Sequence, residues 1–312
     1  MGHQVLNAFE LKTDKNLQAV LVAGPTASGK TALAAAIAEK TGAAAINADS
    51  MQVYADLPIL SAQPTAAEKA AAPHLLFGHI GAERNYSVGQ WLDDARRALA
   101  ECRAENRLAV FVGGTGMYFK ALLQGLSDIP AVPDAVRARV RAECEGVPPA
   151  EIFARLARVD PETAARLRPT DPQRLIRALE IFEAFQTPLA RLQGARKKAP
   201  LLEAARCRCA FLAPERETLN VRIDARFDRM MAAGALEEVS RLRARGLDRT
   251  LPALRAVGVP GLVDYLDGAC SLEAAVSRAK RDSRQYAKRQ FTFARTQLPE
   301  FAWVAVNQAA RS

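Results

Sequence analysis

Residues 20–40, VLVAGPTASGKTALAAAIAEK, contain the pattern that decides the fold of this chain. An apolar run begins near residue 17 and breaks off after residue 23 at a glycine and a proline. A short apolar run bounded by glycine predicts a buried parallel strand. The alanine-rich segment from 29 to 41 predicts a helix that ends at Gly42, because glycine readily adopts the backbone conformation that closes a helix.

The segment between this strand and this helix, GPTASGKT, matches the phosphate-binding pattern G-x-x-x-x-G-K-[ST] in the required context. Its glycines let main-chain N–H groups turn toward phosphate oxygens, and the helix N-terminus adds partial positive charge. We expect Lys30 to reach the farthest phosphate and the Thr31 hydroxyl to ligate Mg²⁺. The predicted diphosphate- or nucleotide-binding loop consists of Gly24, Pro25, Thr26, Ala27, Ser28, Gly29, Lys30 and Thr31.

Further strand patterns occur at 43–47 and 108–116, and an amphipathic helix pattern lies between them at 86–105. Strands that alternate with crossover helices indicate a parallel sheet covered on both faces. The alternation stops after about residue 130, and residues 134–192 show only helical patterns with prolines at the joints. The stretch 194–200 has the composition of a polar hinge, and 206–214 predicts a strand that returns to the sheet. Residues 219–296 are again helical in pattern, and 301–306 fits a late edge strand.

The predicted fold class is therefore α/β, a P-loop NTPase-like parallel sheet core with an α-helical insertion domain. We expect a flexible leader over 1–16, a core domain formed by 17–130 and 201–312, and a helical insertion over 131–200.

What happens to the bound phosphates depends on the neighbouring strands. A P-loop NTPase normally holds Mg²⁺ with a second carboxylate at the end of an adjacent strand. The strand at 108–112 ends instead in Gly113, Gly114 and Thr115, without an acid, which disfavours γ-phosphate chemistry. It favours a close approach of this backbone and of the threonine hydroxyl to a substrate. Asp49 follows the strand at 43–47, at the sheet edge where such folds bind ligands. From its position it is equally suited to cap a following turn or to act in catalysis.

Composition narrows the class of protein. The chain has 312 residues, 49% of them hydrophobic and 25% charged, and no stretch approaches the ~18 uninterrupted apolar residues of a membrane helix. The first fifteen residues are polar and fit neither a signal peptide nor an anchor. The five scattered cysteines include one Cys-x-Cys pair, and no second pair supports a zinc site. We expect a cytoplasmic protein with reduced thiols, no membrane partner and a monomeric state.

The charge points to a polyanionic partner. The formal net charge is +9, from 43 basic and 34 acidic residues. Residues 278–295 carry seven basic side chains against one acid, Asp282, whereas a solvated helix face normally intersperses acids. We interpret this segment as a helix that contacts phosphates.

Five motifs together resemble the tRNA dimethylallyltransferases, also called tRNA isopentenyltransferases. They are GPTASGKT (24–31), DSMQVY (49–54), VGGTGMYFKALLQGL (112–126), DPQRLIRALE (171–180) and AKRQFTFAR (287–295), and the resemblance runs from about residue 19 to about residue 295. It implies transfer of a dimethylallyl group from its diphosphate to N6 of the adenosine immediately 3′ of the anticodon (A37), in tRNAs reading codons that start with U. The loop at 24–31 would then hold a diphosphate with Mg²⁺, and no nucleotide would be hydrolysed.

The resemblance also implies roles for individual residues. Asp49 would accept the N6 proton, a contribution of typically ~10²–10⁴-fold. Lys30 would stabilise the leaving diphosphate, Thr115 would help orient donor or base, and Arg137 would contact donor phosphate or tRNA. The implied contacts to the tRNA anticodon stem-loop are Asp49, Ser50, Met51, Gln52, Gln173, Arg174, Leu175, Ile176, Arg177, Lys288, Arg289, Gln290 and Arg295.

The chain departs from the family pattern at two places. Val259 and Pro260 stand where the family usually has tyrosine and arginine. Leu60, Ser61 and Gln63 stand where glycine, threonine and lysine are expected. These changes concern tRNA affinity and the donor loop rather than the core chemistry.

Two other functions fit parts of the sequence. A small-molecule P-loop kinase would use Asp49 on an acceptor hydroxyl and would turn over ATP. A non-catalytic RNA-binding module would use the basic helix alone, and replacement of Asp49 would then change nothing.

Overall fold

A computed structural model describes residues 16–195 and 197–306. It divides into two compact units: residues 1–124 with 201–312, and residues 125–200. The sequence-based boundary near residue 130 lies six residues beyond the first of these divisions, and the one near residue 200 coincides with the second. The predicted leader lies outside the described residues except for Asn16.

The first unit is built on a parallel sheet of six strands in the order β3-β2-β4-β1-β7-β8. Their bounds are β1 Ala19–Ala23, β2 Ala44–Asn47, β3 His74–Leu75, β4 Ala109–Gly113, β7 Cys207–Ala213 and β8 Ala302–Ala305. The predicted strands are all present, including β7, which returns the chain to the sheet beside β1, and β8, which forms its edge. The short strand β3 at the opposite edge was not predicted.

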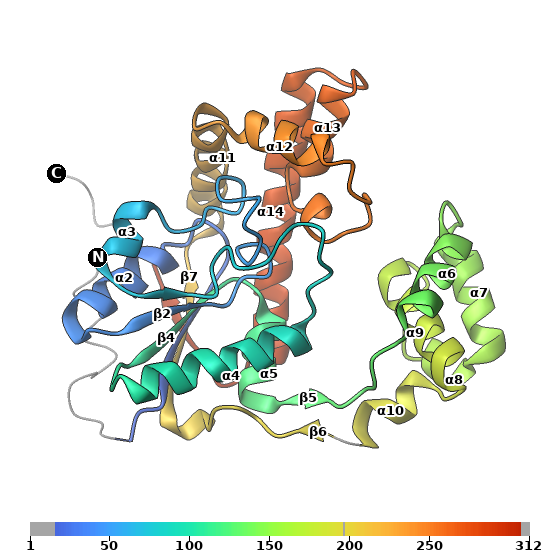
Figure 1. Cartoon of the computed structure of the whole chain (residues 1–312), viewed down its shortest axis with the longest axis horizontal. Coiled ribbons are helices and arrows are strands. Elements are labelled where there is room, and N and C mark those ends of the chain that lie inside the picture. The colour runs from blue at the N-terminus through green and yellow to red at the C-terminus, as the bar shows by residue number, and fades with distance from the viewer. Residues whose placement is uncertain (1–15, 196, 307–312) are drawn as a thin grey trace. The chain divides into compact units, whose positions relative to one another are not determined.

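Helices cover both faces of this sheet, as expected for crossover connections (Figure 1). Alternate strand residues, such as Val20, Val22 and Val110, pack in one core with Leu33 and Ile37 of α2. On the other face the Phe111 ring meets the Trp91 ring of α4 edge to face, with centroids 6.3 Å apart. The helices here are α2 Lys30–Thr41, α3 Ala66–Ala71, α4 Val88–Ala104 and α5 Gly116–Gln124.

After β7 the first unit continues with four helices, α11 Arg216–Ala232, α12 Ala235–Ala244, α13 Val259–Leu266 and α14 Leu272–Gln297, and it also contains two 3₁₀ turns, Ala204–Arg206 and Ala253–Arg255. The longest of these helices, α14, packs against α11, α13 and α5 (Figure 1). It therefore brings residues late in the chain beside elements that follow the first strands.

The second unit contains the predicted helical insertion. Its helices are α6 Asp134–Cys144, α7 Pro149–Val159, α8 Pro161–Ala164, α9 Pro172–Phe185 and α10 Leu189–Ala195. Prolines begin three of them, as expected from the missing N–H of proline at a first helical turn. Val140, Leu156, Leu175 and Leu179 form its fully buried core. The stretch predicted as a polar hinge contains a short strand, β6 Lys197–Lys198, antiparallel to β5 Leu126–Ser127.

Within the described residues, no helix combines the length and the apolar character that crossing a lipid bilayer requires. The five cysteines are free thiols. Burial raises the pKa of Cys207 to about 11 and that of Cys209 to about 12, so both sulfurs in β7 are held as neutral thiols.

Candidate active site

The loop between β1 and α2 has the backbone of a phosphate cradle. Gly29 precedes α2 with a φ of 94°, and Ala27 has a φ of 61°, a left-handed conformation that is uncommon for residues other than glycine. A Cβ on Gly24 would lie 2.9 Å from the main-chain oxygen of Leu212 in β7, so this position tolerates only glycine. The strained turn leaves the N-terminus of α2 open for an anion.

Lys30 is the first residue of α2, and its side chain turns back onto this loop. Its ammonium donates to the main-chain oxygen of Pro25 at 2.6 Å. Burial lowers the pKa of Lys30 to about 7, partly opposed by the nearby Asp49 carboxylate, and the neighbouring Arg226 lowers it further. With a pKa near 7, Lys30 is only partly protonated at neutral pH. A bound anion favours the protonated amine and so raises this pKa.

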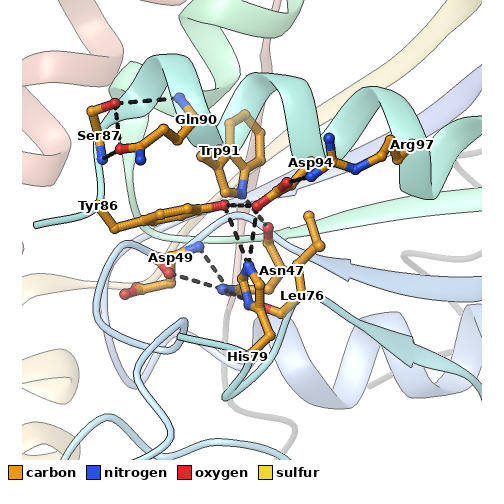
Figure 2. Close-up of polar contacts among 10 residues, drawn as sticks. All are labelled: Asn47, Asp49, Leu76, His79, Tyr86, Ser87, Gln90, Trp91, Asp94 and Arg97. Atoms are coloured by element: carbon orange, nitrogen blue, oxygen red, sulfur yellow. Dashed lines mark hydrogen bonds and ion pairs between the residues drawn. The ribbon is translucent and has the colours of Figure 1, made fainter. Parts of the chain in front are cut away.

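Asp49 stands two residues beyond β2 and is held there by a completely buried asparagine, Asn47 (Figure 2). The Asn47 side chain accepts from the Asp49 N–H at 2.8 Å and donates to the Asp49 main-chain oxygen at 2.9 Å. It also donates to the Leu76 oxygen at 3.0 Å, while its own main-chain oxygen accepts from the Trp91 indole at 2.9 Å. The backbone that carries Asp49 is thereby fixed to α4 and to the segment after β3.

The Asp49 carboxylate itself is oriented by one bond. Its Oδ1 accepts from the Met51 N–H at 2.9 Å. This is the capping geometry that the sequence allowed, and it leaves Oδ2, which lies 3.2 Å from the position of a Cβ on Gly114. The two interpretations of Asp49 are thus compatible, because one oxygen caps the turn while the other faces the loop after β4.

Thr115 ties the loop after β4 to the one after β2. Its Oγ1 accepts from the Ser50 N–H at 2.9 Å and lies 3.2 Å from the Ser50 hydroxyl, and its N–H donates to the Ala48 oxygen at 3.1 Å. The role implied for Thr115 was orientation of donor or base. The structure shows that it orients the segment that carries Asp49.

Two adjoining pockets open at these loops. The first is lined by Thr26, Lys30, Thr31, Asp49 and Arg226, among others. The second has a volume of about 260 Å³ and shares Thr26, Asp49, Ser61 and Arg226 with the first. Most of its remaining wall is apolar and includes Leu60, Ile223, Phe227 and Met230, and Arg255 and Arg289 also line it. A charged, phosphate-sized pocket therefore continues into a pocket suited to a hydrocarbon or a flat base.

The residues present fit a magnesium ion only together with a ligand. Thr31 and Asp49 offer a hydroxyl and a carboxylate, which are the hard oxygen donors that Mg²⁺ prefers. In the described part of the chain no group of three or more His, Cys, Asp or Glu side chains is arranged to hold a metal. Phosphate oxygens from a substrate would have to complete the coordination. The buried Ser28 hydroxyl, which has no hydrogen-bond partner within the described residues, also lies in this loop.

Several residues of the site were not predicted. Arg226 of α11 lines both pockets, and burial lowers its pKa although Asp49 raises it. Tyr286 of α14 lines the second pocket, and burial raises its pKa, with a smaller contribution from Asp49. The signal for Arg226 was present in the sequence, because it flanks the buried stripe formed by Leu219, Ile223 and Phe227 at helical spacing.

The implied tRNA contacts in the first unit fall into two groups. Ser50, Met51 and Arg289 line the second pocket, and Gln52 lines the first. The side chain of Gln52 donates to the main-chain oxygens of Ser61 and Ala62 at 3.0 and 2.8 Å. Part of its hydrogen-bonding capacity is therefore used to hold the loop at 57–63.

Gln290 differs from the prediction. It is 8% exposed, its Oε1 accepts from the Thr26 N–H at 3.1 Å, and its Nε2 donates to the Gly114 oxygen at 2.8 Å. A buried amide that already bonds two loops is poorly placed to contact RNA. It joins the phosphate-binding loop to the loop after β4 instead. Lys288 and Arg295 are exposed, and the Arg295 guanidinium lies over the Trp303 ring at 5.5 Å.

The remaining predicted contacts lie in the second unit. Gln173 and Arg174 are exposed on α9, whereas Leu175 is fully buried in the core of the unit, which argues against RNA contact by its side chain. Ile176 packs partly against that core. Arg177 pairs with the buried Glu180 at 3.1 Å. Arg137 of α6 pairs with Asp134 at 2.9 Å, and its role in catalysis stays a prediction.

Comparisons with known proteins identify the family of the chain. The family model described as IPP transferase matches residues 52–297, and the one described as isopentenyl transferase matches residues 17–74. A tRNA dimethylallyltransferase of Methylocella silvestris is 57% identical over 93% of this chain and 96% of its own length. That of Beijerinckia indica is 56% identical over the same shares.

Solved structures give the same result. The tRNA isopentenylpyrophosphate transferase of Bacillus halodurans is 33% identical, with a TM-score of 0.64 over 92% of this chain and 89% of that one. A eukaryotic dimethylallyltransferase acting on tRNA is 25% identical, with a TM-score of 0.76 over 92% of this chain and 73% of that one. The match of the family model over most of the chain, joined to these relatives, shows that the chain belongs to the IPP transferase family.

Proposed function

We propose that this chain transfers the dimethylallyl group of dimethylallyl diphosphate to N6 of the adenosine immediately 3′ of the anticodon, in tRNAs that read codons starting with U, and that it acts as a monomer with Mg²⁺. Prenyl transfer to tRNA is the activity of the family to which the chain belongs. The observation that carries the finer proposal is the pair of adjoining pockets, one charged and one largely apolar, which meet at Asp49.

The first step in the proposed mechanism is loss of the diphosphate. The bond between C1 of the donor and its bridging oxygen breaks, and the electron pair leaves with the diphosphate. Lys30, Arg226 and the N–H groups of the loop at 24–31 are suited to stabilise that negative charge. When bound, Mg²⁺ supplies further charge neutralisation to the phosphate oxygens, with Thr31 as its ligand from the protein.

The second step forms the new bond. The N6 nitrogen of adenine supplies its electron pair to C1, and the proton that it loses passes to the Asp49 carboxylate. Amine lone pairs of adenine are delocalised into the ring, so a base at this position lowers the barrier by removing the developing charge. Extrusion of the base from its stack costs a few kcal/mol, which contacts from residues such as Ser50 and Tyr286 would offset.

A P-loop kinase is not favoured. β4 ends in glycines and a threonine rather than in the acid that such enzymes use for Mg²⁺. Family membership also places the chain with prenyltransferases.

The test is incubation of the purified chain with dimethylallyl diphosphate, Mg²⁺ and unmodified tRNA, followed by mass analysis of the nucleosides. We expect one prenyl group on adenosine, and we expect Asp49→Asn to lower kcat by ~10²–10⁴-fold with little change in tRNA affinity. Asp93→Asn is the matched control, because Asp93 lies on α4 and pairs only with the exposed Arg96 in the described structure. Consumption of ATP with unaltered nucleosides would overturn the proposal.

A further inference from the structure

Part of the apolar lining of the second pocket lies where three elements meet. A Cβ built on Gly258, at the start of α13, would lie 3.3 Å from Cδ2 of Leu60 and 3.1 Å from the ring of Phe227. Leu60 and Phe227 therefore converge on one point. Both line the second pocket, and neither lines the charged pocket of the phosphate-binding loop. They stand at the part of the cavity that is not shared with the phosphate site.

The backbone of Leu60 is held by a buried carboxylate. Glu238 of α12 is 1% exposed, and its two oxygens accept from the N–H groups of Ile59 at 2.7 Å and Leu60 at 2.9 Å. Burial of a carboxylate is costly unless its oxygens are hydrogen-bonded, and these two bonds satisfy it. The arrangement uses one acid of a distant helix to fix two consecutive residues of the loop at 57–63.

Other bonds limit the movement of this loop. Gln52 donates to the oxygens of Ser61 and Ala62, and Gln63 donates to the Tyr54 oxygen at 2.7 Å. Ser61 lines both pockets, so the loop runs from the phosphate site to the apolar end. A loop fixed at Glu238, Gln52 and Gln63 keeps the Leu60 side chain in place when a flexible hydrocarbon enters.

From this geometry we propose that Leu60, positioned by Glu238, sets the length of the allylic chain that the enzyme accepts and restricts it to five carbons. The inference rests on the proposed function, because it takes the apolar pocket as the site of the donor's hydrocarbon. A ten-carbon donor with the same diphosphate would place its second isoprene unit against Leu60 and Phe227. Pockets of this kind discriminate by roughly 10–200-fold for each methylene that they cannot accommodate.

The experiment compares kcat/KM for dimethylallyl diphosphate and geranyl diphosphate with unmodified tRNA. We expect wild type to prefer the five-carbon donor, and Leu60→Ala to reduce that preference by at least ~10-fold. Ile59→Ala is the matched control. Ile59 lies next to Leu60 and is bonded by the same carboxylate, but its side chain is directed toward Gly234 rather than into the pocket. It should leave the preference unchanged.

Glu238→Gln tests the positioning role. A glutamine retains one acceptor but turns an N–H group toward a main-chain N–H, so Leu60 loses part of its support. We expect the preference to fall in this variant as well, and KM for the five-carbon donor to rise more than kcat falls. Inhibition of the normal reaction by geranyl diphosphate provides a second readout, and its Ki should fall in Leu60→Ala by the same factor.

The experiment distinguishes failure of this inference from failure of the proposed function. If wild type prenylates tRNA and Leu60→Ala keeps the full preference and the same Ki, the inference is wrong and the proposed function stands. A wild type that uses both donors equally well also contradicts the inference. If neither donor modifies tRNA, the proposed function itself fails. Should Leu60→Ala not fold, Leu60→Val removes one methylene and must shift the preference in the same direction.

Discussion

At the scale of single residues, the site brings two basic side chains and one carboxylate together in one pocket. The Asp49 carboxylate raises the pKa of both Lys30 and Arg226, against the larger effect of burial, and all three side chains line the same pocket. A dianionic ligand would raise the pKa of Lys30 and so favour the protonated amine. Binding of an anion at the phosphate-binding loop should therefore depend on pH.

We expect the advantage that Lys30 gives to diphosphate binding to decrease as pH rises through about 7. Above this pH the free site has released the proton of Lys30, whose pKa burial lowers to about 7. Bound diphosphate favours the protonated amine, so binding must take up a proton, and affinity falls by up to about tenfold for each pH unit. Calorimetry with pyrophosphate, without divalent metal, in two buffers of different ionisation enthalpy measures that uptake.

Lys30→Met is the control for this experiment. The titration of pyrophosphate itself is common to both proteins, and only the wild type has the titrating amine. The ratio of the two affinities should therefore decline between about pH 6 and about pH 8, one unit either side of the transition. A constant ratio would mean that Lys30 stays charged in the free site.

At the scale of elements, the sequence predicted the features that depend on residues close together in the chain. It did not predict most of those that depend on contacts between distant segments. The motif at 24–31, the strand ends and Asp49 were predictable because each depends on residues that are close in the chain. β3 was missed because a strand of two residues, His74–Leu75, carries no period. Asn47 and Tyr286 join the site through contacts across elements, and spacing within one segment does not encode these. Arg226 could have been found from its place beside the apolar stripe of α11.

The close approach of the segments that follow β2 and end β4 depends on Gly113, whose role the sequence identified only in part. The double glycine after β4 was predicted to allow close approach to a substrate. A Cβ on Gly113 would instead lie 2.1 Å from the main-chain carbon and oxygen of Ala48 and 2.7 Å from the Asp49 nitrogen. Gly113 is needed because two backbones pass each other here, next to the residue that would act as the base.

Gly113→Ala should therefore destabilise the protein by ~1–3 kcal/mol or more, because neither backbone segment can move without disturbing the sheet. We expect a lower Tm and, in the fraction that folds, a lower kcat because Asp49 is displaced. Gly89→Ala is the matched control. Gly89 lies in α4 with its nearest atom, the Ser87 hydroxyl oxygen, at 3.8 Å, so alanine should raise stability by up to about 1 kcal/mol. Equal Tm values would contradict the close approach.

At the scale of the whole molecule, the excess positive charge is less available than the sequence suggests. Three basic residues of α14 pair with acids of other helices: Arg278 with Asp264, Lys280 with Asp228 and Arg284 with Asp224, at 2.9, 2.6 and 2.5 Å. Acids that were absent from the helix itself are thus supplied by α11 and α13. Among the described residues no acid pairs with Arg281, Lys288, Arg289 or Arg295, and the guanidinium groups of Arg289 and Arg295 lie over the rings of Tyr286 and Trp303. We therefore expect Arg281 and Lys288 to be the basic side chains of α14 most free to contact RNA phosphates.

This division predicts different salt dependence for different basic residues of one helix. Each phosphate contact contributes about one to the slope of the logarithm of the binding constant against the logarithm of salt concentration. Arg281→Ala and Lys288→Ala should each weaken tRNA binding and lower the slope by about one. Arg278→Ala and Lys280→Ala remove the same charge from α14 but break an ion pair within the protein, so their slopes should stay near that of wild type. Filter binding of tRNA across a salt series measures all four, and an equal drop in all of them would mean that only net charge attracts the tRNA.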